Sequence, residues 1–181
     1  MSKEKNISNG VKTKKNYLTF SPRQTLSLAE KLARDILRGE GKENRRQKAF
    51  LVGLEGNLGG GKTTFLKGFA KGLGIKERIL SPTFVIIRRF QLNNLTIKQF
   101  DNFYHIDCYR IEKPEEILTL GFKKIISDPK NIVCIEWADK IKKILPKETL
   151  WIKFEIKNKN QRKISIFGNQ KFKFVLRTKR R

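Results

Sequence analysis

The sequence predicts an α/β protein in which helices flank a sheet and an antiparallel, β-rich part lies at the C-terminal end. The first indication is the short apolar run 49–54, which is typical of a strand buried on both faces of a parallel sheet. It is followed by the segment 56–63, GNLGGGKT, which fits the phosphate-loop pattern G-x-x-x-x-G-K-[ST], and by a helical pattern over 64–73. The second indication is the period-two alternation of 150–156 and 162–167 around a polar turn. Together these observations predict a P-loop nucleoside triphosphatase-like sheet.

The glycine-rich motif carries the chemistry of this prediction. Its four glycines let the backbone take positive φ and wrap around an anion, and the N–H groups at the start of the following helix supply donors. Lys62 is predicted to reach the terminal phosphates of a nucleotide, and the Thr63 hydroxyl to ligate Mg²⁺. A glycine-rich turn with a solvated Lys62 is the alternative. It is disfavoured because the motif sits at the strand-to-helix junction that it requires.

The segments before the motif predict a strand and a helix. Residues 1–16 are polar and basic and are predicted to be a disordered arm, and 17–20 fit a short strand. Ser21 and Pro22 resemble a helix N-cap followed by proline at the first helical position. Apolar residues then recur at helical spacing up to Gly39 or Gly41, so this helix is expected to pack on the sheet.

A loop and a hairpin are predicted after the helix of the motif. The loop 81–84, SPTF, lies where nucleoside triphosphatases place a switch loop, so Thr83 is a candidate sensor of the γ-phosphate or its Mg²⁺. Ser-Pro is also an ordinary turn signal. The segments 88–95 and 96–104 are expected to pair as an antiparallel hairpin turned at 93–94.

Two acids lie at predicted strand ends. Asp107 falls in the mixed apolar-polar segment 105–110, and Glu136 comes near the end of the apolar run 131–137, NIVCIEW. A buried parallel strand brings such a carboxylate to the edge of the sheet where the phosphate loop also lies, and there it can hold Mg²⁺ or orient water. Each acid alone could be a surface residue. Because the motif is present, at least one is expected to serve the metal, and Glu136 has the better strand for it.

The remaining segments complete one predicted domain. A helix is expected from Lys113 to near Gly121, 122–127 is expected to lead into the next strand, and 138–145 to form a short helix. Residues 171–176 are expected to add a strand. The domain is thus predicted to span 17–176, between the basic arm 1–16 and a basic tail 177–181.

The formal net charge of +24 suits a protein that meets a polyanion. Lysine is spread among many Ile and Asn residues, a pattern that AT-rich coding bias also produces, and the two interpretations weigh about evenly. The basic clusters at 12–15, 45–46 and 177–181 are the candidate nucleic-acid contacts.

The sequence favours a soluble cytoplasmic protein with no membrane contact, because no stretch has the apolar length of a membrane span and the N-terminus lacks a signal core. Cys108 and Cys134, in apparent strands, are expected to be reduced structural thiols. His105 alone is not expected to complete a zinc site.

Five segments resemble, in order and approximate spacing, the bacterial TsaE family, the small ATPase of tRNA threonylcarbamoyladenosine biosynthesis: GNLGGGKTTFLKGFAKGLG, SPTF, YHIDCYR, EEILTLGF and CIEWADKI. The similarity runs from about residue 17 to about residue 168. It implies a Mg²⁺-dependent ATP-binding and hydrolysing protein that supports threonylcarbamoyl transfer to adenosine in tRNA without itself modifying the tRNA. The implied partners are transferase subunits of the TsaD and TsaB type, which ATP binding and hydrolysis are thought to reset between turnovers.

The resemblance also implies roles for single residues. Lys62, Asp107 and Glu136 would be catalytic, with Asp107 orienting or activating the attacking water, and Thr63 and Glu136 would ligate Mg²⁺. The implied ATP contacts are Leu58, Gly59, Gly60, Gly61, Lys62, Thr63, Thr64, Thr83, Trp137, Arg162 and Thr25. Arg162 matches only with a one-residue gap, and Thr25 would neighbour the base. Trp137, Tyr109 and Phe84 can equally be read as core aromatics.

Three features depart from the family pattern. Gly60 stands where alanine is commoner, Asn57 stands where Asp is frequent, and the loop 39–48 is longer and more basic. The first two are expected to be tolerated, because neither side chain is needed to cradle phosphate.

Two other functions stay open: a nucleic-acid-binding accessory protein with a regulatory nucleotide site, and a P-loop small-molecule kinase, for which no acceptor pocket can be identified. A GTPase is disfavoured because the N/T-K-x-D motif is absent. No arginine finger is evident, so slow hydrolysis raised by a partner is expected.

Overall fold

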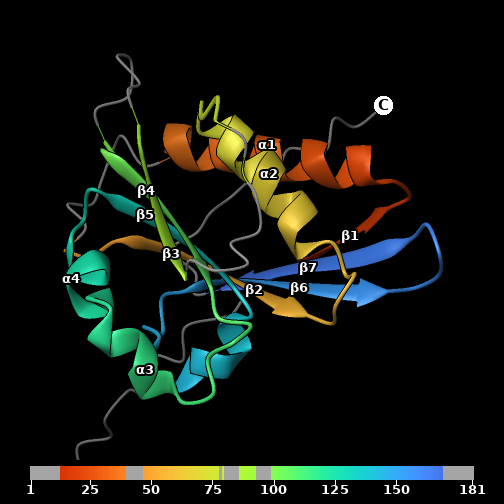
Figure 1. Ribbon diagram of the computed structural model, residues 1–181. Helices are drawn as coiled ribbons and strands as arrows, with labels where there is room; N and C mark the ends of the chain where they lie inside the picture. Colours follow the sequence, from red (N-terminus) through yellow and green to blue (C-terminus); the bar gives the residue numbers. More distant parts are fainter. Residues whose placement is uncertain (1–12, 40–46, 78, 80–85, 93–98, 169–181) are drawn as a thin grey trace, which may run out of the picture.

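The computed structural model describes residues 13–39, 47–77, 79, 86–92 and 99–168. These residues form a seven-stranded sheet in the order β1-β7-β6-β2-β5-β4-β3 (Figure 1). The strands are β1 Thr13–Thr19, β2 Phe50–Gly56, β3 Ile87–Gln91, β4 Asn102–Asp107, β5 Asn131–Glu136, β6 Leu150–Ile156 and β7 Arg162–Gly168. The neighbours β6, β2, β5 and β4 are parallel, whereas β3, β7 and β1 run antiparallel to the strands beside them. The carboxyl ends of β1, β2, β4, β5 and β6 therefore share one edge of the sheet, which we call the carboxyl edge.

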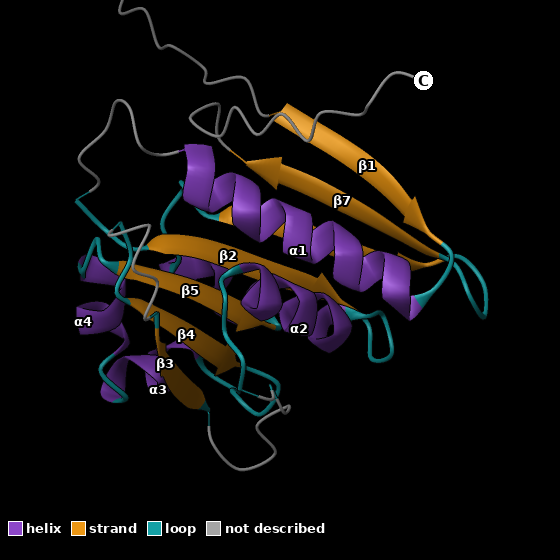
Figure 2. Cartoon of the chain, turned by 90° about the horizontal axis from the view of Figure 1, so that it is seen from above, coloured by secondary structure: helices purple, strands orange, loops and turns teal. Residues whose placement is uncertain are grey.

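Helices cover both faces of the sheet. α1 Pro22–Gly39 and α2 Lys62–Gly72 lie on one face, and α3 Pro114–Thr119, α4 Phe122–Ser127 and the 3-10 helix η1 Ala138–Ile144 lie on the other (Figure 2). Side chains alternate along each strand and so feed two separate cores: in β5, Cys134 packs beneath α1 and α2, and Val133 faces the other layer. All six residues of β5 are buried, as expected of a central strand covered on both sides.

Two glycines of α2 bring its backbone close to α1. A Cβ at Gly68 would lie 2.3 Å from the Leu26 carbonyl oxygen, and a Cβ at Gly72 would lie 2.5 Å from the Glu30 carbonyl oxygen. Only glycine permits this approach, because any side chain would overlap the backbone of α1. The pair of helices therefore packs as one layer over the core.

Most predicted elements are confirmed. They include the helix that begins at Pro22, the strand and helix on either side of the glycine-rich motif, the β3–β4 and β6–β7 hairpins, and helices within 113–121 and 138–145. The helix within 138–145 is the 3-10 helix η1.

Two expectations are wrong in detail. Residues 13–16 are not part of a disordered arm, because they pair with β7 in β1. Residues 105–107 are not a separate strand: pairing with β5 runs unbroken from Asn102 to Asp107, so they end the returning strand of the hairpin, and Cys108 follows it. Residues 122–127 lead into β5 as expected, and they do so as the helix α4, whose buried Phe122 joins the core beneath it.

The C-terminal hairpin is confirmed, and its place in the sheet is more central than the sequence indicated. It is antiparallel as predicted, but β6 also pairs in parallel with β2, so this part continues the central sheet. The expected strand 171–176, the turn at 93–94, Thr83, and the basic clusters at 45–46 and 177–181 lie outside the described residues. Within the described part of the chain, each helix is too short or too polar to form a membrane span.

Candidate nucleotide-binding site

The glycine-rich loop turns at the carboxyl edge, between β2 and α2. Gly56 has a φ of 138°, and a Cβ there would lie 2.5 Å from the Phe154 carbonyl oxygen of β6. Gly60 donates its backbone N–H to the Asn57 carbonyl oxygen over 3.0 Å. A Cβ at Gly60 would lie 2.8 Å from that same oxygen, so alanine at this position would require the Asn57 carbonyl to move. Glycine at position 60 therefore allows this conformation of the turn, which alanine would disturb.

Lys62 opens α2 and is buried at the base of the loop. Its Nζ donates to the carbonyl oxygens of Gly56 at 2.6 Å and Asn57 at 3.0 Å. The same ammonium lies 3.6 Å from the centroid of the Trp137 ring. Burial lowers the pKa of Lys62, and the nearby carboxylates of Glu136, Asp139 and Asp107 oppose that shift.

Thr63 and Glu136 meet across the site. The Thr63 Oγ1 hydroxyl donates a 2.7 Å hydrogen bond to Glu136 Oε2. Thr63 lies in the first turn of α2, and Glu136 is the last residue of β5 and is 2% exposed. Two oxygen ligands of the kind that Mg²⁺ prefers are thus brought together by elements 73 residues apart in sequence.

His105 is the site residue that the sequence analysis missed. It is fully buried in β4, and its Nε2 lies 3.1 Å from Glu136 Oε1, so both oxygens of the carboxylate are engaged. Its Nδ1 is buried without a hydrogen-bond partner among the described residues. His105 and Asp107 are two positions apart in one strand, so their side chains share a face, and this spacing was the signal available in the sequence.

Asp107 ends β4 and is the backbone partner of Glu136 in the parallel ladder. Its Oδ1 accepts a hydrogen bond from the Tyr109 N–H at 2.9 Å, and its side chain is half-buried. The structure therefore brings the two predicted carboxylates to the ends of neighbouring strands.

Trp137 follows Glu136 with a φ of 56°, a left-handed conformation that is uncommon for a bulky side chain. The Tyr109 ring packs against it, with 5.2 Å between the ring centroids, and Tyr109 is 53% exposed. A continuous contact thus runs from solvent through two aromatic rings to the Lys62 ammonium.

The other predicted ATP contacts are spread around the loop. Arg162 donates from Nη2 to the Gly59 carbonyl oxygen over 3.3 Å, so this C-terminal arginine reaches the loop despite the sequence gap in its match. Leu58 is 75% exposed at the loop tip, and Thr64 is half-buried in the first turn of α2. Thr25 is 2% exposed, and its hydroxyl is 2.9 Å from the Thr19 hydroxyl, so a contact with a base remains a prediction for this residue.

The oxygen ligands of this site suit Mg²⁺ better than a metal ion that is coordinated only by protein side chains. Among the described residues, no group of three or more His, Cys, Asp and Glu side chains is arranged to hold a metal ion. Mg²⁺ usually takes one or two protein ligands and completes its shell with phosphate oxygens and water. Thr63 and Glu136 fit that requirement.

Comparisons with known proteins identify the family of the chain. The family model for "Threonylcarbamoyl adenosine biosynthesis protein TsaE" matches residues 19–164, which include the whole candidate site. The chain belongs to the TsaE family. A TsaE of Bacillus subtilis, described as a tRNA threonylcarbamoyladenosine biosynthesis protein, is 35% identical over 147 residues, which are 81% of each protein. The TsaE of Rickettsia felis is 37% identical over 120 residues, and the match covers 66% of each protein.

The chain is also similar to a solved structure. The crystal structure of Bacillus subtilis YdiB superposes with a TM-score of 0.64 at 29% sequence identity, and the match covers 89% of each chain. The chain spans about two thirds of the length of the Rickettsia felis relative, and 65% of the TsaE of Rickettsia conorii.

Proposed function

We propose that this chain is a Mg²⁺-dependent ATP-binding and ATP-hydrolysing accessory protein for threonylcarbamoyl transfer to adenosine in tRNA. The observation that carries the proposal is the 2.7 Å hydrogen bond from Thr63 Oγ1 to Glu136 Oε2. It joins the helix after the glycine-rich loop to the acid at the end of β5, and this is the pairing that holds Mg²⁺ in P-loop nucleoside triphosphatases. The names of the relatives support the tRNA pathway.

The residues of the site divide the chemistry among them. The loop N–H groups and the Lys62 ammonium bind the triphosphate. In this conformation the Gly56 and Asn57 carbonyl oxygens accept hydrogen bonds from that ammonium, so they compete with the phosphates for it. Bound Mg²⁺ would supply neutralisation of phosphate charge, with Thr63 and Glu136 as its protein ligands. Asp107 orients the water that attacks the γ-phosphorus, and cleavage of the bond to the bridging oxygen yields ADP and phosphate.

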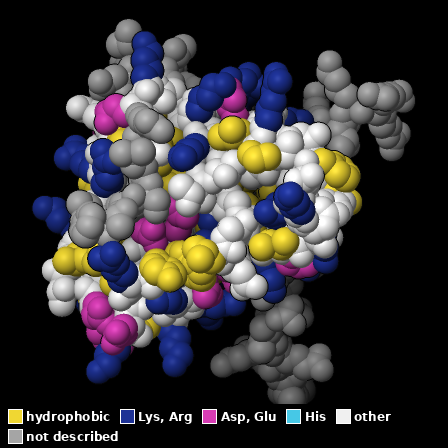
Figure 3. All heavy atoms as spheres, turned by 45° about the vertical axis from the view of Figure 1, so that its right-hand side comes forward, with side chains coloured by type: hydrophobic (Ala, Val, Ile, Leu, Met, Phe, Trp, Pro, Cys, Tyr) yellow, Lys and Arg dark blue, Asp and Glu magenta, His cyan; other side chains and the backbone are white. Residues whose placement is uncertain are grey.

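The same proposal includes a partner that docks at the carboxyl edge. Six large hydrophobic side chains are exposed among the described residues, and five of them lie at this edge: Leu18, Phe20, Leu58, Tyr109 and Ile156. Figure 3 looks toward the side on which β2 and β6 end, and it shows separate hydrophobic patches between Lys and Arg side chains. Exposed aromatic and apolar residues of this kind anchor protein interfaces. Transferase subunits of the TsaD and TsaB type are the proposed partners.

Docking there would act on the loop lysine. Tyr109 contacts Trp137, and Trp137 lies against Lys62. A partner that moves Tyr109 can therefore change how firmly Lys62 is held away from phosphate. We expect slow turnover by the chain alone and faster turnover with the partner.

The test is Mg²⁺-dependent ATP turnover, measured for the chain alone and with purified TsaD- and TsaB-type subunits. Lys62→Ala and Glu136→Ala are expected to lower turnover on the order of 100-fold or more, because each removes charge stabilisation at the phosphates. Lys67→Ala is the matched control: it removes an exposed lysine from the same helix and should stay near wild type.

Two outcomes would count against the proposal. Turnover that is equal with and without the subunits would remove the partner role. Absence of turnover under every condition, with RNA binding intact in the wild type, Lys62→Ala and Glu136→Ala, would favour the regulatory nucleotide site.

A further inference from the structure

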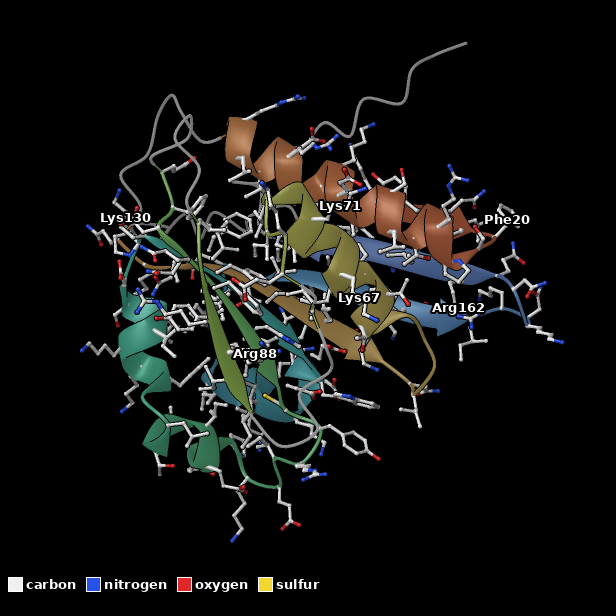
Figure 4. All side chains as sticks on the ribbon, turned by 45° about the horizontal axis from the view of Figure 1, so that its top comes forward. Phe20, Lys67, Lys71, Arg88, Lys130 and Arg162 are labelled. Carbon is white, nitrogen blue, oxygen red and sulfur yellow. The ribbon has the colours of Figure 1, made fainter. Side chains whose placement is uncertain are left out.

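The outward face of α1 and α2 carries a concentrated positive charge. We define the α1–α2 basic face by the six exposed cations on these helices: Arg23, Lys31, Arg34, Arg38, Lys67 and Lys71. Those of α1 recur at helical spacing on one side of the helix, and at 1.5 Å per residue the stripe is about 22 Å long. Figure 4 shows Lys67 and Lys71 projecting from α2, which lies beside α1.

Acidic residues do little to offset this charge. On the outward side of α1 and α2 the carboxylate is that of Glu30. Its side chain is 17% exposed, and it already pairs with Arg34 and Lys71. Asp35 is half-buried and one of its carboxylate oxygens is enclosed, so it adds little negative charge to the exposed face. The α1–α2 basic face therefore keeps a net excess of cations.

The opposite helical layer has a different composition. Between residues 112 and 148 the exposed lysines are interspersed with exposed acids at Glu112, Glu115, Glu116, Asp139 and Glu148. No arginine occurs in that stretch, whereas α1 presents three. Coding bias toward lysine would affect both layers alike, and it explains neither the arginines nor the shortage of acids on the α1–α2 basic face.

We propose that the α1–α2 basic face binds the phosphate backbone of an RNA, independently of the nucleotide site. None of the large hydrophobic side chains exposed in the described residues lies on α1 or α2, so this face lacks the apolar anchors of a protein interface. Nucleic-acid interfaces are instead polar and strongly positive, and the arginine fork matches phosphate geometry. Because the stripe of cations is about 22 Å long, it can contact several successive phosphates of one RNA.

The experiment measures fluorescence anisotropy of a fluorescein-labelled, unmodified tRNA transcript over a series of KCl concentrations. The test variant combines Arg23→Glu, Arg38→Glu and Lys67→Glu, three residues that form no ion pair with another described residue. The matched control combines Lys123→Glu, Lys124→Glu and Lys143→Glu on α4 and η1, which are equally exposed and change the net charge by the same amount.

The test variant should bind the transcript at least about tenfold more weakly, with a salt slope reduced by about one per cation removed. The control should bind within about threefold of wild type. A triple variant with glutamine at Arg23, Arg38 and Lys67 should give an intermediate loss, and thermal unfolding midpoints check that each variant is folded.

Three results would overturn the proposal. The first is that the wild-type chain fails to bind the transcript at about 0.1 M salt. Alternatively, the control could lose as much affinity as the test variant, which would indicate overall charge alone. Finally, the test variant could keep its RNA affinity and lose the transferase subunits, which would identify this face as a protein interface.

Discussion

The carboxyl edge of the sheet and the α1–α2 basic face adjoin each other, because both helices begin at that edge, yet they differ in composition. The edge combines exposed hydrophobic side chains with buried polar groups such as His105 and Glu136. The basic face has exposed cations and no exposed large hydrophobic side chain. The contrast teaches that strand ends and their loops can bring buried polar groups and exposed apolar side chains together, whereas the exposed surface of the two helices carries charge without large apolar side chains.

The sharpest probe of the edge is Cys108, whose thiol is fully buried between Asp107 and exposed Tyr109. Burial raises its pKa to about 12, and Asp107 adds to the shift. At pH 8 its thiolate should be about 1000-fold scarcer than that of an ordinary cysteine, so alkylation of the native protein should slow by a similar factor. Iodoacetamide labelling followed by peptide mass spectrometry measures this rate, with the urea-unfolded chain as reference.

The same thiol gives a sign for the pH dependence of stability. Its pKa is higher in the folded state than the ordinary value of 9.0. The contribution of this thiol to the free energy of unfolding is therefore intact below pH 9 and is lost as the pH rises toward 12. Rapid labelling of native Cys108 at pH 8 would mean that the edge is open to solvent beneath Tyr109.

Glycine substitutions compare the two regions in stability. Gly68→Ala is expected to cost about 3 kcal/mol, because its Cβ would lie 2.3 Å from the Leu26 carbonyl oxygen and would push α1 away. Gly59→Ala in the loop is expected to cost only about 1 kcal/mol, since its Cβ would meet nothing within 4 Å and only the φ of 72° is strained. Urea unfolding curves measure both losses. Equal losses would show that the contact between α1 and α2 is not as tight as the structure has it.

Tyr109→Ala tests the proposed binding of the transferase subunits at the carboxyl edge. Its affinity for the transferase subunits is expected to fall about tenfold, because an exposed aromatic anchor is removed. Leu120→Ala is the control, since Leu120 is exposed to 46% but lies at the end of α3, away from the carboxyl edge. Isothermal titration calorimetry with ATP and Mg²⁺ present measures both affinities. A larger loss for Leu120→Ala would move the docking surface to the other helical layer.

Local signals were enough to predict most of the fold. Pro22 after Ser21, the glycines before Lys62, and the alternating segments of β6 and β7 each act within a few residues, and the structure confirms the elements that they predict. Long-range pairing explains the failures. Residues 13–16 look like a polar arm until β7 pairs with them, and Asn16 Oδ1 accepts a hydrogen bond from Ser165 across that pairing.

For the candidate site, the sequence predicted the ligand types but not how they are supported. The motif indicated Lys62 and Thr63, and the apolar run before Glu136 indicated a strand ending in an acid. The spacing of His105 from Asp107 was visible in the sequence, but the contact of His105 with Glu136 was not, because Glu136 lies 31 residues away in a neighbouring strand. The contact of Arg162 with the Gly59 carbonyl spans 103 residues and depended in the same way on the final packing.

The sequence by itself determined the strand, loop and helix around Lys62, because glycine, lysine and apolar residues at that spacing restrict the backbone locally. It also determined the family, because its motifs follow one another in a set order. Only the tertiary structure decided which polar groups meet at the carboxyl edge and that the cations of α1 and α2 form one face. Those features depend on strand register and on the close packing that Gly68 and Gly72 allow between two helices, and both are properties of contacts between distant residues.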